Sequence, residues 1–263
     1  MTALGSAAYD VVDESEAVEL YYANGWTDGL PVVPPTAERV AAFLDAAGLD
    51  AETLVGTYAL RSRPIFAEKL AINAVMAGCR PEYFTVVVAI VEGLLEPEYQ
   101  VHTINSSTGS PVVGFIVNGP IRQTIGMNCY GNMLGPGNRA NSTIGRAIRL
   151  IQMNVMGSRP GAGSPFDTEA TPALDRATMG QPAKYTGYHI VENEEDFPSW
   201  TPLHVERGFA ADQSAVTVLP LWGHLMLSNH AETTPDEWID STAQYVIGAG
   251  RLMEDCFGAL LVP

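Results

Sequence analysis

The segment Val112–Asn118 (VVGFIVN) constrains the fold most, because it is apolar along almost its whole length. Such a run is typical of a central strand that is buried on both faces. A loop rich in glycine and asparagine follows from Gly119 to Asn138, and Arg139 to Asn154 then returns to the 3.6-residue period of a helix. The order strand, loop, helix predicts an α/β fold, with α+β as the alternative, built around a central mixed sheet.

Two apolar helices are predicted ahead of this strand. Pro64 opens the first, which runs to Ala77, and Pro81 opens the second, which runs to Leu95. Both are apolar on nearly every side, so we expect a buried helix pair packed on the sheet. The other predicted helices are at 14–24, 36–47 and 235–247, and the other predicted strands are at 101–105, 186–192 and 214–221.

The balance of charge excludes several classes of partner. The 263 residues carry 30 Asp and Glu against 14 Lys and Arg, which gives a formal net charge of −16. Such a surface repels nucleic-acid phosphates and anionic lipid, so we expect binding to neither nucleic acid nor membrane. The three widely spaced cysteines form no disulfide framework, and the N-terminal residues lack the pattern of a secretory signal. We therefore expect a cytoplasmic protein with one domain over 1–263, either undivided or with a helical N-terminal lobe at 1–95.

A positive and amide-rich island lies within this acidic chain. Arg139 and Arg146 are two turns apart on the helix after the Gly/Asn loop, so they share a face. Backbone N–H groups at the start of that helix, together with a guanidinium fork, favour a carboxylate or phosphate. Asn118 ends the central strand, where ligand crevices of α/β folds form, and Asn138 and Asn141 flank the helix start. The alternative is that these asparagines serve only turns and that the arginines pair with acids of the chain.

The chain also offers a candidate nucleophile and a candidate acid–base pair. Cys79 lies ahead of the helix opened by Pro81, where the helix dipole and Arg80 would lower its pKa. A free cysteine is also a common small buried residue. His204 and Glu206 alternate along a stretch expected to be extended, so they would face one side, although a lone histidine is more often structural. No two histidines have a strong metal-binding spacing, and no motif names a cofactor.

Weaker signals lie elsewhere in the chain. Arg149 follows on the same helix as the two candidate arginines, and Asn105 belongs to the asparagines that gather at predicted strand ends. Lys184 stands next to a tyrosine, but without the helical spacing of a catalytic Tyr–Lys pair. Cys129 is a rival thiol in the Gly/Asn loop, and the acidic run at 192–196 is expected to be a solvated loop.

Several long motifs resemble one group of proteins. They are TDGLPVVPPT at 27–36, AINAVMAGCRPEY at 71–83, VNGPI at 117–121, GPGNRANSTIGRAIRL at 135–150 and ENEEDFPSWTPLHVERGF at 192–209. The chain resembles the uncharacterised bacterial UGSC-motif (seleno)protein family, in the region that accompanies the motif, from Thr27 to about Phe209. No UGSC or CGSC sequence is present. If the family is a thiol or selenol redox system, as its name implies, the resemblance implies that this chain handles the substrate.

Together these features predict an enzyme of small-molecule metabolism that acts on a small anionic substrate bearing a carboxylate or phosphate. The arginine and asparagine island would hold the anion, with Cys79 as thiolate and His204 as proton carrier. The resemblance implies thiol-dependent lyase or oxidoreductase chemistry. The alternative is a non-catalytic subunit that docks a separate redox-motif partner through the Gly/Asn loop and the apolar segment 258–263, which would serve as a pairing edge. In either case we expect a homo-oligomer or a hetero-oligomer.

Overall fold

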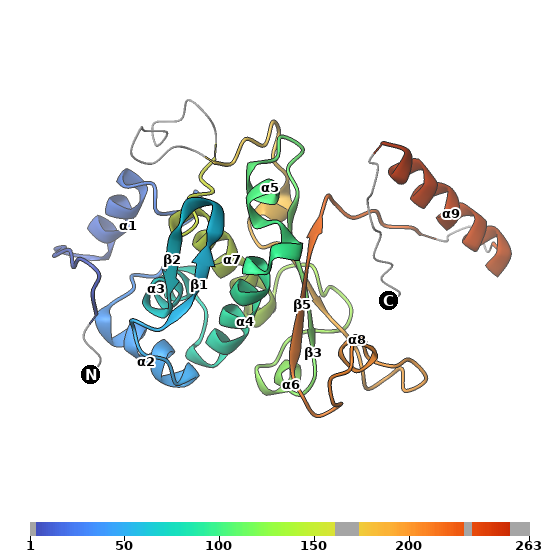
Figure 1. The fold of residues 1–263 in the computed structure, drawn as a ribbon, viewed down its shortest axis with the longest axis horizontal. Coiled ribbons are helices and arrows are strands. Elements are labelled where there is room, and N and C mark those ends of the chain that lie inside the picture. Colours follow the sequence, from blue (N-terminus) through green and yellow to red (C-terminus); the bar gives the residue numbers. More distant parts are fainter. Residues whose placement is uncertain (1–3, 161–173, 229–232, 253–263) are drawn as a thin grey trace. The chain divides into compact units, whose positions relative to one another are not determined.

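The chain divides into two compact units, Met1–Gly223 and His224–Pro263. The computed structural model describes residues 4–160, 174–228 and 233–252. Within these ranges the first unit holds both sheets and the helices α1 to α8, and the second holds α9 (Pro235–Leu252) (Figure 1). The sequence predicted one domain over the whole chain, and the structure groups its contacts into two units.

A three-stranded sheet of the first unit has the order β4-β3-β5 (Figure 1). The central strand β3 (Val112–Asn118) runs parallel to β4 (Tyr188–Val191) and antiparallel to β5 (Ala215–Leu221). Every residue of β3 except Ile116 is buried. The structure thus confirms the predicted central strand, the strands expected at 186–192 and 214–221, and a mixed sheet of the α/β or α+β class.

The predicted pair of apolar helices is confirmed as α3 (Ala67–Ala77) and α4 (Phe84–Leu95), with α4 against β5 and α3 against α7. The first helix begins later than expected, because Pro64 lies in β2 (Arg63–Phe66). This strand pairs antiparallel with β1 (Leu54–Tyr58) in a hairpin that the sequence did not predict. Proline suits a two-stranded hairpin, where an edge position needs no N–H donor.

Helix α7 (Arg139–Asn154) confirms the predicted helix with the same bounds. Its apolar side chains Ile144, Ile148 and Ile151 lie fully within the core. Gly145 touches the backbone that leads into β4, because a Cβ atom at this position would lie 1.7 Å from the carbonyl oxygen of Thr186. Only glycine allows this approach, so α7 and the segment before β4 are in direct backbone contact.

The strand predicted at 101–105 is wrong, because this segment forms the helix α5 (Val101–Ser106). Its buried residues are Val101 and Asn105, which are four positions apart and therefore share one helix face. The remaining helices are α1 (Glu14–Ala23), α2 (Ala37–Ala47), α6 (Ile121–Thr124), α8 (Leu203–Glu206) and the 3₁₀ turns at Ala59–Arg61, Pro81–Tyr83, Pro97–Tyr99 and Pro182–Lys184. Of these, α1 and α2 confirm predictions, whereas α6 and α8 were not foreseen.

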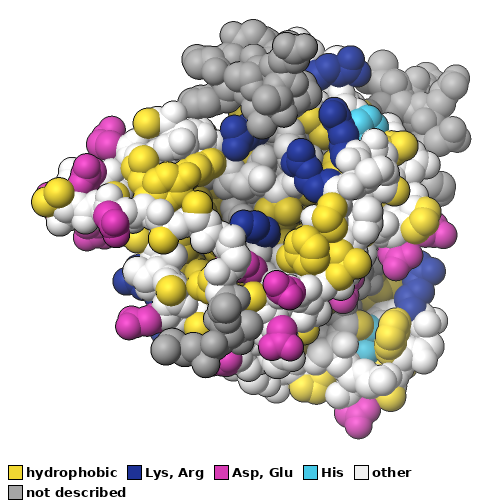
Figure 2. Space-filling view, turned by 60° about the vertical axis from the view of Figure 1, so that its left-hand side comes forward, with side chains coloured by type: hydrophobic (Ala, Val, Ile, Leu, Met, Phe, Trp, Pro, Cys, Tyr) yellow, Lys and Arg dark blue, Asp and Glu magenta, His cyan; other side chains and the backbone are white. Residues whose placement is uncertain are grey.

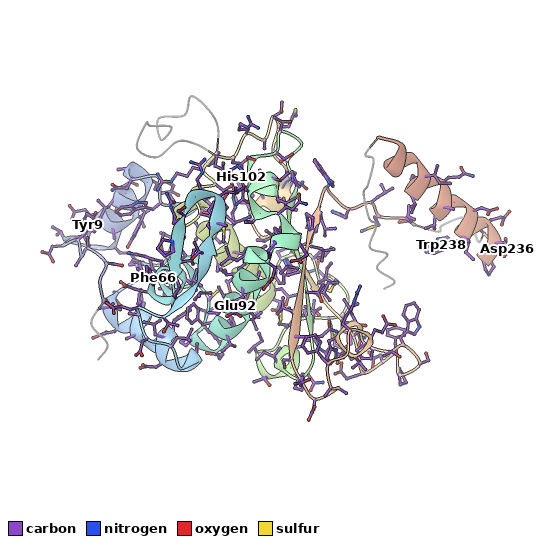
Figure 3. The ribbon with its side chains drawn as sticks, in the orientation of Figure 1. Tyr9, Phe66, Glu92, His102, Asp236 and Trp238 are labelled. Carbon is purple, nitrogen blue, oxygen red and sulfur yellow. The ribbon has the colours of Figure 1, made fainter. Side chains whose placement is uncertain are left out.

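The second unit is described for α9 and the residues just ahead of it. The hydroxyl of Thr234 accepts a hydrogen bond from the Glu237 backbone N–H at 3.3 Å, which caps the helix start and confirms its predicted beginning. Figure 3 shows Asp236 in the first turn, where its negative charge suits the helix dipole. The apolar segment 258–263, predicted to pair as a strand, lies outside the described residues.

Candidate anion-binding site

Arg139, predicted to hold an anion at the start of α7, contacts the protein backbone. Its Nε donates to the carbonyl oxygen of Gly78 at 2.9 Å, and its Nη2 donates to that of Cys79 at 3.4 Å. These carbonyls lie at the C-terminal end of α3, where helix carbonyls lack partners within the helix. Arg139 therefore joins α7 to the end of α3. Among the described residues it shares no hydrogen-bond partner with Asn118, although the sequence predicted that the two would bind one anion together.

Asn138 and Asn141 organise the loop that precedes α7. Asn138 caps the helix, because its Oδ1 accepts from the Asn141 backbone N–H at 3.0 Å and its Nδ2 donates to Gly126 O at 2.8 Å. The fully buried Asn141 side chain accepts from Asn128 N at 3.0 Å and donates to Asn128 O and Met133 O at 2.9 and 3.2 Å. Both amides are thus occupied by protein groups, as the turn interpretation of these asparagines expects.

Arg146 forms a two-pronged ion pair with Asp28. Its Nε and Nη2 each lie 2.8 Å from a carboxylate oxygen of Asp28, and Nη2 also donates to Pro31 O at 2.9 Å. The Asp28 side chain is 3% exposed. Arg146 therefore anchors the loop that contains the TDGLP motif to the middle of α7.

Asn118 and His204 lie close to the same carboxylate. The Asn118 Nδ2 donates to Glu192 at 2.5 Å and to Glu194 at 3.0 Å, and His204 Nδ1 is 3.9 Å from the same Glu194 oxygen. His204 is 1% exposed, and neither ring nitrogen has a hydrogen-bond partner among the described residues. Glu206 is exposed on the same short helix, α8, so the predicted extended pair of His204 and Glu206 is wrong.

Arg122 neutralises the acidic run that the sequence predicted to be a solvated loop. Its side chain is 3% exposed and its Nη2 lies 2.9 Å from both Glu194 and Glu195. The guanidinium is the largest cause that lowers the pKa of Glu195, through a hydrogen bond. The start of this run is thus tied to the end of β3, and the expectation of a fully solvated loop is wrong.

The predicted lowering of the Cys79 pKa is also wrong. Cys79 is buried, and desolvation raises the pKa of its thiol to about 12, although Thr143 and Arg139 oppose the shift. Burial also raises the pKa of Cys129, which is half-buried. Both side chains are therefore protonated thiols at neutral pH, a form that is a poor nucleophile.

A small pocket lies at the other end of the sheet, near the start of β3. We call it the donor pocket. Five of its polar lining residues come from four segments of the chain: Asn105, Arg149, Gln152, Ser158 and Lys184. Val113, Phe115 and Ile148 line the same space with apolar atoms. This mixture is typical of sites for small organic molecules, in which an apolar wall is combined with a few fixed polar groups.

Two buried donors of this pocket lack a partner among the described residues. Asn105 accepts from Gln152 Nε2 at 2.7 Å through its Oδ1, whereas its Nδ2 has no hydrogen-bond partner. The Ser158 hydroxyl has none either, and the two residues are 4% and 1% exposed. An unpaired buried donor costs about 1–3 kcal/mol, so a ligand that accepts both hydrogen bonds would recover that cost.

The donor pocket also carries an excess of positive charge. Arg149 Nη2 and Lys184 Nζ both contact the buried Asp175, at 3.1 and 2.6 Å, so two cations share one carboxylate. Burial lowers the pKa of Arg149 and of Lys184, while Asp175 raises both. A bound anion would balance the second cation.

Sequence patterns indicated three residues of this pocket, but they did not predict that the three lie together. Asn105 stood among the asparagines, Arg149 followed the two candidate arginines and Lys184 was a weak acid–base signal. Ser158 gave no signal. Arg149 lies three residues after Arg146, and that small change of angle on α7 moves it from the Asp28 contact to the pocket.

No group of three or more His, Cys, Asp or Glu residues that could hold a metal ion occurs in the described ranges. None of the helices described is both long and apolar enough to cross a membrane. Comparison of the chain with protein-family models, with curated proteins and with solved structures found no match.

Proposed function

We propose that the protein is an enzyme of small-molecule metabolism whose carboxylate- or phosphate-bearing substrate binds in the donor pocket. The observation that carries this proposal is the pair of buried, unpartnered donors, Asn105 Nδ2 and Ser158 Oγ, beside Arg149 and Lys184. All four groups donate hydrogen bonds, so they suit an acceptor that carries negative charge. The apolar lining would hold the carbon skeleton of the substrate.

Lys184 is the group that could move a proton in this pocket. Its Nζ donates to both oxygens of Asp175, at 2.8 and 2.6 Å, which leaves one N–H of the ammonium for a ligand. Burial lowers the pKa of Lys184 and thus brings it closer to neutral pH, where lysine can act as a general acid or base. The chemistry that we propose is proton transfer next to the anionic group of the substrate.

The resemblance to the UGSC-motif family fits a substrate-handling role for this chain. Cys79 and Cys129 do not line the donor pocket, and burial raises the pKa of both. If the reaction is of the thiol-dependent lyase or oxidoreductase type that the resemblance implies, the reactive thiol would belong to the substrate or to a second protein. We accordingly assign no catalytic role to Cys79.

Titration calorimetry with a panel of small mono- and dicarboxylates and phosphate esters tests the proposal. We expect Arg149→Lys to weaken binding by about tenfold, because it keeps the charge and loses the planar fork. Arg146→Lys is the matched control on the same helix, and since its side chain contacts Asp28 it should change the affinity by less than about twofold. Equal losses in the two variants, or no binding of any probe, would contradict the proposed site.

Turnover separates the enzyme from the non-catalytic subunit. Each ligand that binds is incubated with the protein, with and without a thiol reductant, and the mixture is followed by mass spectrometry. Conversion that Lys184→Met abolishes while binding persists supports catalysis in the donor pocket. Bound ligands that all stay unchanged would favour the subunit that only delivers a substrate to a partner.

A further inference from the structure

Three arginines line a second, partly open pocket, in which Arg159 is half-buried and Arg61 and Arg63 are exposed. Arg61 and Arg63 come from the β1–β2 hairpin, where Ser62 adopts a left-handed φ of 48°, and Arg159 follows the end of α7. We call this the arginine pocket. It shares no lining residue with the donor pocket, so it is a separate cavity on the other side of the segment 152–159.

Among the described residues, these arginines differ from the buried arginines in having no acidic partner. Arg122, Arg146 and Arg149 each form an ion pair with a carboxylate. Within the described ranges no ion pair joins the arginines of the second pocket to an acid.

Arg159 occupies a position that is unfavourable for its positive charge. Burial is the larger cause that lowers the pKa of Arg159, and the positive charge of Arg63 lowers it further. Both effects disfavour the charged guanidinium, and a negative charge between the two side chains would reverse them. Figure 2 shows several Lys and Arg side chains gathered on one face of the protein, apart from most of the acidic side chains in that view.

Helix capping explains only part of this arrangement. Arg63 Nη1 donates to Val155 O at 2.9 Å, which satisfies one carbonyl just past the last turn of α7. Gly157, next to this contact, has a φ of +81°, a backbone conformation that glycine adopts without strain. No such bond to the described backbone is formed by the Arg61 or Arg159 side chains, so among the three arginines of this pocket helix capping involves Arg63 alone.

We infer that the arginine pocket binds a phosphoryl group, as free phosphate or as part of a larger ligand. A phosphate dianion carries two charges and presents several acceptor oxygens, and guanidinium forks match this geometry better than any other side chain. Three arginines from two segments can surround it and neutralise its charge. This site is additional to the donor pocket and does not depend on the function proposed there.

Phosphate titration at constant ionic strength, with chloride as the balancing ion, tests the inference. The measurement is made in the Arg149→Lys background, so that phosphate binding in the donor pocket is weakened and the two proposals can fail separately. We expect one phosphate site, weakened about tenfold by Arg159→Gln and by Arg61→Gln. Far-UV circular dichroism confirms that each variant is folded.

Arg207→Gln supplies the matched control, because it removes the same charge from an exposed position that lines neither pocket. It should change the phosphate affinity by less than about twofold, through long-range charge alone. A loss in Arg207→Gln as large as in Arg159→Gln would mean that net charge sets the affinity, and the site would be rejected. Absence of binding at millimolar phosphate would also reject it.

Discussion

The two ends of α7 differ in what their polar side chains contact. From the N-terminal end to the middle of the helix, Arg139, Asn141 and Arg146 direct their polar groups to partners within the protein. Near the C-terminal end Arg149 shares one carboxylate with Lys184, and buried donors lack partners. Both ends are rich in arginine and amides, so composition alone does not distinguish a structural cluster from a binding site. The buried donors without a hydrogen-bond partner, which lie near the C-terminal end, do distinguish the two.

Removing Arg146 should have the largest effect on stability, because its side chain has a structural role in the middle of α7. Arg146→Ala leaves the buried carboxylate of Asp28 without its cation, so we expect a loss of about 3 kcal/mol in the free energy of unfolding. Urea denaturation measures it. The exposed Arg207→Ala should cost less than about 0.5 kcal/mol, and a loss of similar size in both variants would mean that the Asp28 contact is not structural.

An alkaline pH profile tests whether Cys79, beside Arg139, is an inert core residue. Its pKa rises from 9.0 to about 12 on folding, so the folded protein keeps a proton that the unfolded chain releases. The stabilising effect is complete below pH 9.0, and it is lost as the pH rises from there towards 12. The free energy of unfolding should therefore fall less steeply above pH 9.0 in Cys79→Ala than in the wild type. Rapid alkylation of Cys79 in the folded protein at neutral pH would contradict its inert role.

Ser158→Ala should have the smallest effect on stability, and the opposite sign. Because it removes a buried hydroxyl that has no partner, we expect a gain of up to about 1 kcal/mol together with weaker ligand binding. Ser106→Ala is the control, since this hydroxyl donates to His102 O at 2.8 Å and its loss should cost about 1 kcal/mol. Equal losses in the two serine variants would show that Ser158 is bonded in solution, which would weaken the case for the donor pocket.

Periodicity and capping residues predicted much of the fold. The bounds of α7 and β3 were predicted as observed, because long segments with a clear period are decided locally. The segment 101–105 failed, since a short polar helix with two buried residues has no distinct period. The β1–β2 hairpin was missed because Pro64 is equally good at opening a helix and at an edge position.

The candidate site could be predicted only in its chemistry. The sequence predicted an anion site on the arginine-bearing helix, but which arginine is left with an unbalanced charge depends on where Asp28 and Asp175 lie after folding. Asn105, Ser158 and Lys184 reach one pocket through packing between distant segments. No pattern in a single sequence predicts that such distant residues will lie together. Arg61 and Arg63 of the arginine pocket could not be predicted either, because they lie in the β1–β2 hairpin that the sequence did not indicate.

The contact between Gly145 and the Thr186 carbonyl has a consequence for redesign. Gly145 is one turn from Arg149, and Thr186 is two residues from Lys184, so the spacing between the two cations is held by main-chain atoms. If the donor pocket binds the proposed substrate, its apolar lining can therefore be exchanged while the spacing between Arg149 and Lys184 stays fixed. Libraries for new substrate specificity should vary Val113, Phe115 and Ile148 and leave position 145 as glycine.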